Sequence, residues 1–146
     1  MIIEVSNIRI EKNNTDEVKA TLDSAVNKAL TIIGINAEKY AKALCPVGTQ
    51  ESTGIRGYRG GTLRNSITYN VENETLIVGS NVEYAPYVEL GTGPYFSPPP
   101  KWEHFEVPPS KGIGRAYVHA RPYLRPAIED HLDEYKDIIK HELQDA

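Results

Sequence analysis

The sequence has little cysteine and no long apolar run. Its one cysteine, Cys45, has no second cysteine to pair with, which excludes the disulfide framework of small secreted domains and favours a reducing cytoplasm. The first residues, MIIEVSNIRIEK, lack the basic start and apolar stretch of a signal peptide. No later segment approaches the ~18 consecutive apolar residues of a membrane span. We therefore expect a soluble protein that does not contact membranes.

An excess of basic charge is also missing. The chain carries 16 Lys and Arg against 20 Asp and Glu, which gives a formal net charge of −4. A protein that grips nucleic acid needs clustered Lys and Arg to displace the counterions of the phosphates. Tight DNA binding is therefore not expected.

Recognisable catalytic motifs are absent as well. Neither the Gly-x-Ser-x-Gly of serine hydrolases nor the His-Glu-x-x-His of zinc proteases occurs, and the glycine-rich stretch 47–61 lacks the lysine of a phosphate loop. His104 has no second histidine or cysteine at metal-ligand spacing. A pair of catalytic acids could only be assembled by folding, from Glu83, Glu89, Glu103 or Glu106. We expect no catalytic residues, no metal and no cofactor.

A long amphipathic helix is the strongest structural signal. It is expected from about Asp16 to Leu44, where the apolar residues at helical spacing are Val18, Leu22, Ala25, Val26, Ala29, Ile33, Tyr40 and Leu44. Such a helix measures ~43 Å, more than the ~30 Å diameter of a small domain, so part of it should project or cover a neighbour. Gly34 and Asn36 interrupt the stripe, as a kink or as a locally satisfied irregularity.

The remaining pattern predicts an α+β fold in one domain, residues 1–146. A small, mainly antiparallel sheet is expected to pack against the long N-terminal helix and a C-terminal helix. Alternation of apolar and polar residues predicts strands at 2–10 and 115–120 and a hairpin over 67–79, with a helical turn at 62–66 and a short helical or turn segment at 84–90. Pro122 should begin the last helix, whose apolar face includes His131 as a hydrogen-bonded boundary residue.

Two long loops are expected, at about 47–61 and 93–114. The first is rich in glycine and carries Arg56 and Arg59, which either contact a partner or are simply solvated. The second holds six prolines, which forbid regular structure, and is either a docking arm or a loop folded onto its own domain. Its aromatic residues, too apolar for a mere tether, are Tyr95, Phe96, Trp102 and Phe105.

Three segments, in this order, resemble motifs of a known family. The first is Ala43-Leu44-Cys45-Pro46 with Gly48-Thr49 and then Thr62-Leu63-Arg64-Asn65-Ser66-Ile67, similar to Pro-x-Asp-Thr-Gly-x-Leu-Arg-x-Ser-Ile but split by about a dozen residues. The second is Tyr84-Ala85-Pro86-Tyr87-Val88-Glu89-Leu90-Gly91-Thr92, and the third is Ala120-Arg121-Pro122-Tyr123-Leu124-Arg125-Pro126-Ala127. They resemble the small tail-component or tail-completion proteins of long-tailed bacteriophages, typified by the tenth gene product of a lambdoid siphophage.

The resemblance implies a scaffold rather than a reaction centre. The residues that carry it are Leu63, Arg64, Ser66, Tyr84, Tyr87, Glu89, Gly91, Thr92, Arg121, Pro122, Leu124 and Pro126. Gly91 permits backbone angles closed to other residues, and Pro122 presets a first helical turn. Glu89 and Arg121, the charged members of the two most specific motifs, are expected to form an ion pair.

The resemblance also implies a place in the virion. It suggests a head-tail joining subunit in a ring, hexameric in the family's pattern, at the head-proximal end of the tail. Its partners would be further copies, tail-tube proteins and head-closure or connector proteins, and acidic residues facing the channel would let DNA pass without tight binding. Two other functions stay open: a small prophage-encoded hydrolase or nuclease, and a peptide-binding adaptor whose Pro-aromatic loop grips a partner.

Overall fold

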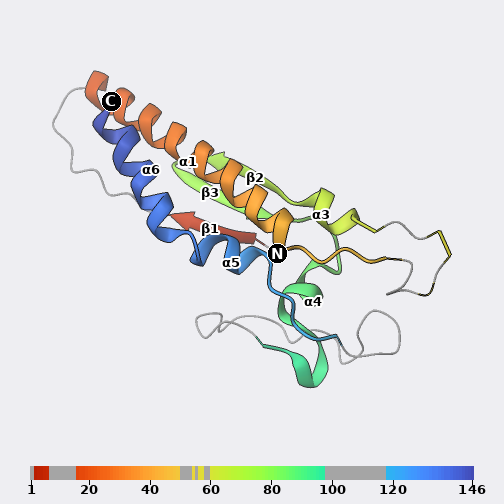
Figure 1. The fold of residues 1–146 in the computed structure, drawn as a ribbon. Helices are drawn as coiled ribbons and strands as arrows, with labels where there is room; N and C mark the ends of the chain where they lie inside the picture. The colour runs from red at the N-terminus through yellow and green to blue at the C-terminus, as the bar shows by residue number, and fades with distance from the viewer. Residues whose placement is uncertain (1, 7–15, 50–53, 55, 58–59, 98–117) are drawn as a thin grey trace.

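The computed structural model describes residues 2–6, 16–49, 54, 56–57, 60–97 and 118–146. Along the chain these form β1 (Ile2–Ser6), α1 (Asp16–Leu44), α3 (Thr62–Ser66), β2 (Thr68–Glu72), β3 (Thr75–Gly79) and α4 (Ala85–Leu90). A 3-10 turn, η1 (Gly93–Tyr95), then α5 (Leu124–Glu129) and α6 (Leu132–Gln144) follow. Figure 1 shows α1 lying over the sheet with α6 alongside it. The architecture is α+β, as the sequence predicts.

The sheet is antiparallel, with the strand order β1-β3-β2. The predicted hairpin is confirmed: Thr68 pairs with Gly79 and Glu72 with Thr75. Asn73 and Glu74 join the strands with φ angles of 50° and 59°, the left-handed values of a tight two-residue turn whose twist matches that of the strands. The first strand is confirmed from Ile2 to Ser6; the rest of its predicted span, residues 7–10, lies outside the described residues.

α1 covers one face of the hairpin, and its bounds are those predicted. Its buried stripe packs against Leu76 and Val78 of β3, while Tyr69 of β2 is partly buried there. Gly34 is the point of closest approach, because a Cβ at this position would lie 2.4 Å from Cδ2 of Tyr69. The interruption in the apolar stripe is therefore the place where an aromatic ring packs against the helix backbone.

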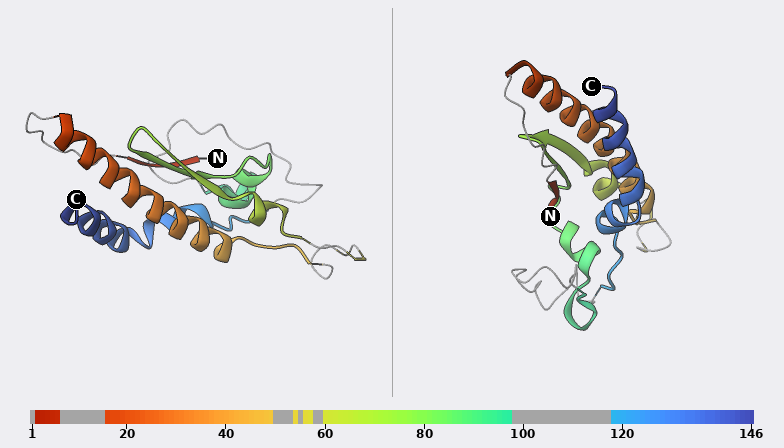
Figure 2. Two further views of the ribbon diagram at one scale, coloured as in Figure 1. Left: turned by 90° about the horizontal axis from the view of Figure 1, so that it is seen from above. Right: turned by 90° about the vertical axis from the view of Figure 1, so that its left-hand side faces the viewer.

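The first turns of α1, unlike the rest of the helix, do not pack against the hairpin. Residues 16–21 are all exposed, and Val18, on the predicted apolar stripe, is 47% exposed. Figure 2 shows this end of the helix extending beyond the sheet, with the end of α6 nearby. The expectation that part of the long helix projects is confirmed.

The C-terminal segment differs from the single predicted helix in two ways: it begins at Leu124 rather than at Pro122, and it breaks at Asp130 and His131. In one continuous helix the amide of His131 would donate to the carbonyl of Ala127. The hydroxyl of Tyr135 donates to that oxygen instead, at 2.6 Å, and the amide of His131 turns to Ile128 O at 3.3 Å. At this break a buried tyrosine hydroxyl takes the place of a helix amide on Ala127 O, and the segment forms two helices, α5 and α6.

His131 sits at this break, beside α1. Its ring stacks on Tyr40 with the centroids 3.6 Å apart, and its Nδ1 lies 3.3 Å from Glu134 Oε2. Tyr40 Oη and Asn36 Nδ2 both donate to the Glu134 carboxylate, and the bond from Tyr40 raises the pKa of that phenol. The predicted boundary role of His131 is confirmed, and the cluster joins α1 to α6.

The predicted strand at 115–120 is wrong for the residues described. The amide of Val118 donates to Thr92 Oγ1, and the amide of Arg121 donates to Val88 O. These bonds tie residues 118–121 to α4 and the residues after it rather than to the sheet. None of the helices in the described part of the chain combines the length and the apolar character that crossing a bilayer requires.

Candidate functional site

The three motif segments, far apart in sequence, converge at one end of the molecule. Together they surround a surface pocket of about 350 Å³, which we call the motif pocket. It is lined by Pro46, Gly48, Gly61, Thr62, Leu63, Tyr84, Val88, Val118 and Arg121. The first motif supplies the wall from the end of α1 to α3, the second supplies α4, and the third supplies Arg121. The dozen residues that split the first motif do not prevent its two halves from meeting, because the amide of Gly60 donates to Gly48 O at 3.1 Å.

Glu89 holds the second motif to the third. Its side chain is only 2% exposed, and its Oε2 accepts the amides of Tyr123 (2.7 Å) and Leu124 (3.0 Å). Its Oε1 accepts the amide of Arg125 at 3.0 Å. These are the amides at the start of α5, which have no partners inside the helix and carry its positive dipole end. A carboxylate from a distant helix therefore caps α5.

This geometry corrects the predicted pairing of Glu89 with Arg121. Both carboxylate oxygens of Glu89 are taken by backbone amides, and the described residues contain no ion pair between the two side chains. Arg121 is exposed and contributes its backbone amide to the joint instead. The sequence held a signal for the true arrangement: residues 120–123, Ala-Arg-Pro-Tyr, offer no side chain that could cap the helix that follows.

Gly91 and Thr92 complete the joint. Gly91 has a φ of 77°, and a Cβ there would lie 2.4 Å from Tyr95 O and 2.8 Å from the amide nitrogen of Ala120. Thr92 is fully buried; its amide donates to Val118 O and its Oγ1 accepts the amide of Val118, both at 2.8 Å. Only glycine fits the first position, and a buried hydroxyl satisfies a backbone donor at the second.

Ser66 joins α3 to the turn before α4. Its hydroxyl donates to Leu63 O at 2.6 Å and lies 2.6 Å from the hydroxyl of Ser80, which in turn accepts the amide of Val82 at 3.1 Å. Leu63 itself is buried in the core. These two motif residues therefore fix the position of α3 at the pocket.

Two buried groups near the pocket remain protonated. Cys45 is 6% exposed, and burial raises the pKa of its thiol from 9.0 to about 11. Burial likewise raises the pKa of Tyr123, whose hydroxyl donates to Ala85 O at 3.5 Å. A thiol that stays protonated at neutral pH is a poor nucleophile, so the structural interpretation of Cys45 is favoured.

The remaining motif residues surround the same joint. Leu124 is buried in the core, Tyr84 and Tyr87 are partly buried on α4, and Pro122 and Pro126 are partly buried around the start of α5. Arg64 is exposed; the position of a Cβ on Gly61, in the pocket wall, is 3.5 Å from its Nη2. The guanidinium of Arg64 therefore lies at the rim of the motif pocket.

The predicted partner contacts are only partly visible. Arg56 is exposed, Phe96 is partly buried, and Tyr95, 42% exposed, stacks on His119 with the ring centroids 3.6 Å apart. Arg59, Trp102 and Phe105 lie outside the described residues, as do His104, Glu103 and Glu106. The start of the predicted arm is fixed, since the amide of Ser97 donates to Leu90 O at 2.8 Å.

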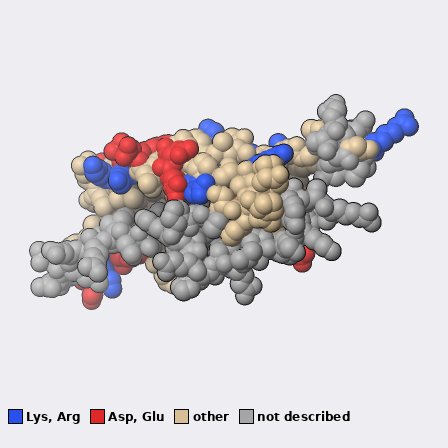
Figure 3. All heavy atoms as spheres, turned by 90° about the horizontal axis from the view of Figure 1, so that it is seen from below, with Lys and Arg blue, Asp and Glu red and all other residues tan. Residues whose placement is uncertain are grey.

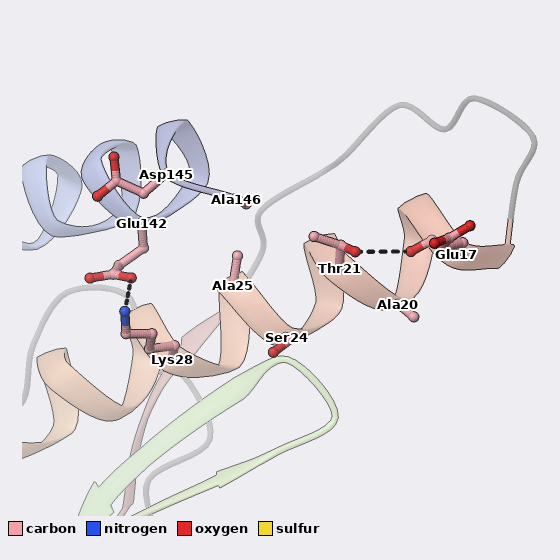
Figure 4. Close-up of a pocket in the computed structure, with 9 residues that line it drawn as sticks. All are labelled: Glu17, Ala20, Thr21, Ser24, Ala25, Lys28, Glu142, Asp145 and Ala146. Atoms are coloured by element: carbon pink, nitrogen blue, oxygen red, sulfur yellow. Dashed lines mark hydrogen bonds and ion pairs between the residues drawn. The ribbon is translucent and has the colours of Figure 1, made fainter.

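A second surface feature lies at the far end of the molecule. Between the first half of α1 and the end of α6 runs a groove of about 510 Å³, which sequence reasoning missed (Figure 4). Lys28 of α1 and Glu142 of α6 form an ion pair of 2.9 Å across it. Glu17 and Asp145 also line it, so its charge is mainly acidic. Among the described residues, no cluster of three or more His, Cys, Asp or Glu could hold a metal ion.

Comparison with known proteins identifies a family. The model of the family described as "Bacteriophage HK97-gp10, putative tail-component" matches residues 9–91, more than half of the chain. The matched range takes in α1, α3, the β2–β3 hairpin and α4, and ends at Gly91. No curated protein and no solved structure gave a significant match.

Proposed function

The chain belongs to the HK97-gp10 family of bacteriophage tail components, and from that premise we propose that it is a tail-completion subunit that joins the tail to the head. In this role it acts as a structural protein of the virion, made in the cytoplasm of the bacterial host. Its activity is assembly: it binds further copies of itself, tail-tube proteins and head-closure proteins.

The main support for this proposal is that the motif residues hold separate parts of the backbone in place. The one carboxylate of the second motif caps a helix, its glycine and threonine close a backbone joint, and the serine of the first motif fixes a helical turn. Glu89, one of the four acids considered for catalysis, has both oxygens engaged by amides. The motif therefore builds a rigid surface, which supports a structural role over a catalytic one.

A ring of copies, which we take to be hexameric, fits the shape of the subunit. Rotational symmetry requires two different patches on each subunit, one for each neighbour. The exposed start of α1 lies at one end of the molecule, and α3 and α4, which line the motif pocket, lie at the other (Figure 1). DNA would pass through the centre of such a ring without tight binding, because the chain has a net charge of −4.

Deletion of the gene from its phage tests the proposal. Without the protein, infected cells should yield DNA-filled heads and tails of normal length that are not attached to each other, seen by electron microscopy. Expression of the wild-type chain from a plasmid should restore infectious particles. Normal attached particles from the deletion phage would refute the role, and loss of tails altogether would place the protein at another stage of tail assembly.

A further inference from the structure

Two arginines at the motif pocket have no ion-pair partner among the described residues. Arg121 lines the pocket and is exposed, and Arg64 reaches the rim beside Gly61. Neither guanidinium forms an ion pair with any residue that the structure describes. The pocket walls between them are largely apolar, formed by side chains such as Leu63, Val88 and Val118. The matching ligand is thus a small apolar side chain flanked by carboxylates.

The opposite end of the same chain presents that chemistry. α1 begins Asp16-Glu17-Val18, and all three residues are exposed. Neither carboxylate is in an ion pair within the described residues, and Val18, 47% exposed, is one of several large apolar side chains that the core leaves uncovered. Asp145 of α6 lines the adjoining groove and adds negative charge nearby, while Glu142 there is paired with Lys28. Figure 3 shows most of the described acidic side chains toward this end, with Lys or Arg side chains among them, and a basic side chain projecting at the far tip.

A single molecule cannot bring these two surfaces together. α1 has 29 residues and spans ~43 Å. Its start lies at one end of the molecule, and Pro46 and Gly48, which follow its last turn, line the motif pocket at the other. We propose that the start of α1 in one copy, Asp16 to Val18, docks in the motif pocket of the next copy. This contact rests on the proposed ring. Because it is head-to-tail, repeated copies either close into a ring or extend into a filament.

Paired charge reversal tests the contact. One variant carries Asp16→Lys and Glu17→Lys, so both of its ends are basic; the other carries Arg64→Glu and Arg121→Glu, so both are acidic. Each alone should self-associate at least about tenfold more weakly than the wild type in sedimentation at low salt. An equimolar mixture should recover association to within about threefold, because every contact between unlike variants pairs opposite charges. Association of the wild type should weaken with added salt.

The control has the same change in charge at a different place. Asp133→Lys with Asp137→Lys alters two exposed acids of α6 and should leave association unchanged, and circular dichroism verifies that every variant is folded. Single variants that associate like the wild type, a mixture that does not recover, or a wild-type chain that stays monomeric up to millimolar concentration would each overturn the contact.

The same variants separate this contact from the proposed function. In the deletion phage, each variant alone should fail to restore infectious particles, and both expressed together should succeed. If each variant alone restores infectivity, the contact is refuted while the tail-completion role stands. If the gene proves dispensable for attachment, that role fails, and the sedimentation result still decides whether the contact exists.

Discussion

The two ends of this molecule are held by different kinds of interaction. At the motif end, Glu89 and Thr92 are buried polar groups that satisfy backbone amides from distant parts of the chain. At the far end, α1 and α6 are joined across the groove by Lys28 and Glu142, whose side chains are 67% and 12% exposed. Buried hydrogen bonds are costly to break, whereas exposed ion pairs contribute little.

This difference explains where the family motifs fall. A buried joint depends on single atoms, so its residue types are tightly constrained, while a solvated helix end tolerates many sequences. The motif end is thus expected to be rigid, and the far end is expected to tolerate changes in its residue types. Four experiments test this difference between the two ends.

The largest effect is expected from Glu89→Ala. The change leaves three amides at the start of α5 without their acceptor in a buried site, so the free energy of unfolding should fall by about 3 kcal/mol or more. Urea denaturation measures it. Glu89→Gln, which keeps the shape and one acceptor oxygen, should lose less, about 1–2 kcal/mol. Glu83→Ala, on an exposed side chain, is the control, and an equal loss in all three would contradict the capping role.

The second-largest effect is expected on the rate at which the Cys45 thiol reacts. With the pKa of the thiol raised from 9.0 to about 11, the folded protein should react with a thiol reagent at pH 8 about 100-fold more slowly than the unfolded chain in urea. Its rate should rise about tenfold per pH unit up to pH 10. Because the folded state holds the proton more tightly, stability should also fall as the pH rises from about 9 to 11. Equal rates in the folded and unfolded chains would show that the thiol is accessible.

Gly91→Ala should have a smaller effect than loss of Glu89. The new methyl group would meet two backbone atoms as well as the strain of a φ of 77°, so we expect a loss of about 2 kcal/mol. Gly54→Ala is a matched control, with a φ of 69° and open space around the Cβ, and should cost about 1 kcal/mol or less. Thermal unfolding compares the two, and an equal loss would mean that backbone contact at Gly91 is not the cause.

The smallest effect is expected from Lys28→Met. The exposed ammonium contributes little when its partner Glu142 is screened by solvent and salt, so the midpoint of thermal unfolding should not change measurably. The measurement is repeated at low and high salt. A clear loss of stability at high salt would show that the far end is held as firmly as the motif end.

The sequence predicted the local elements well because their signals are local. The helical stripe from Asp16 to Leu44, the hairpin with its Glu-Asn-Glu turn and the turn of helix at 62–66 each follow from residues close in the chain. The break before α6 was not predicted, since the hydrogen bond from the Tyr135 hydroxyl to Ala127 O that accompanies it has no signal in the local pattern. The spacing of apolar and polar residues in that segment predicts one helix.

The contacts of Glu89 show more clearly what could not be predicted from the sequence. The resemblance identified Glu89 and Arg121 as charged motif residues, and charge alone suggested that they pair. The structure instead places the carboxylate on three backbone amides, which carry no side-chain signature in a sequence. The motif pocket and the acidic groove arise in the same way, from segments that only the fold brings together.

Electron cryo-microscopy of intact particles would locate the subunit in the virion. We expect the subunit to appear as a ring at the junction of tail and head, with the start of α1 in each copy seated against α3 and α4 of its neighbour. Density for the chain at the distal tip of the tail, or no density for it in the particle, would contradict the account.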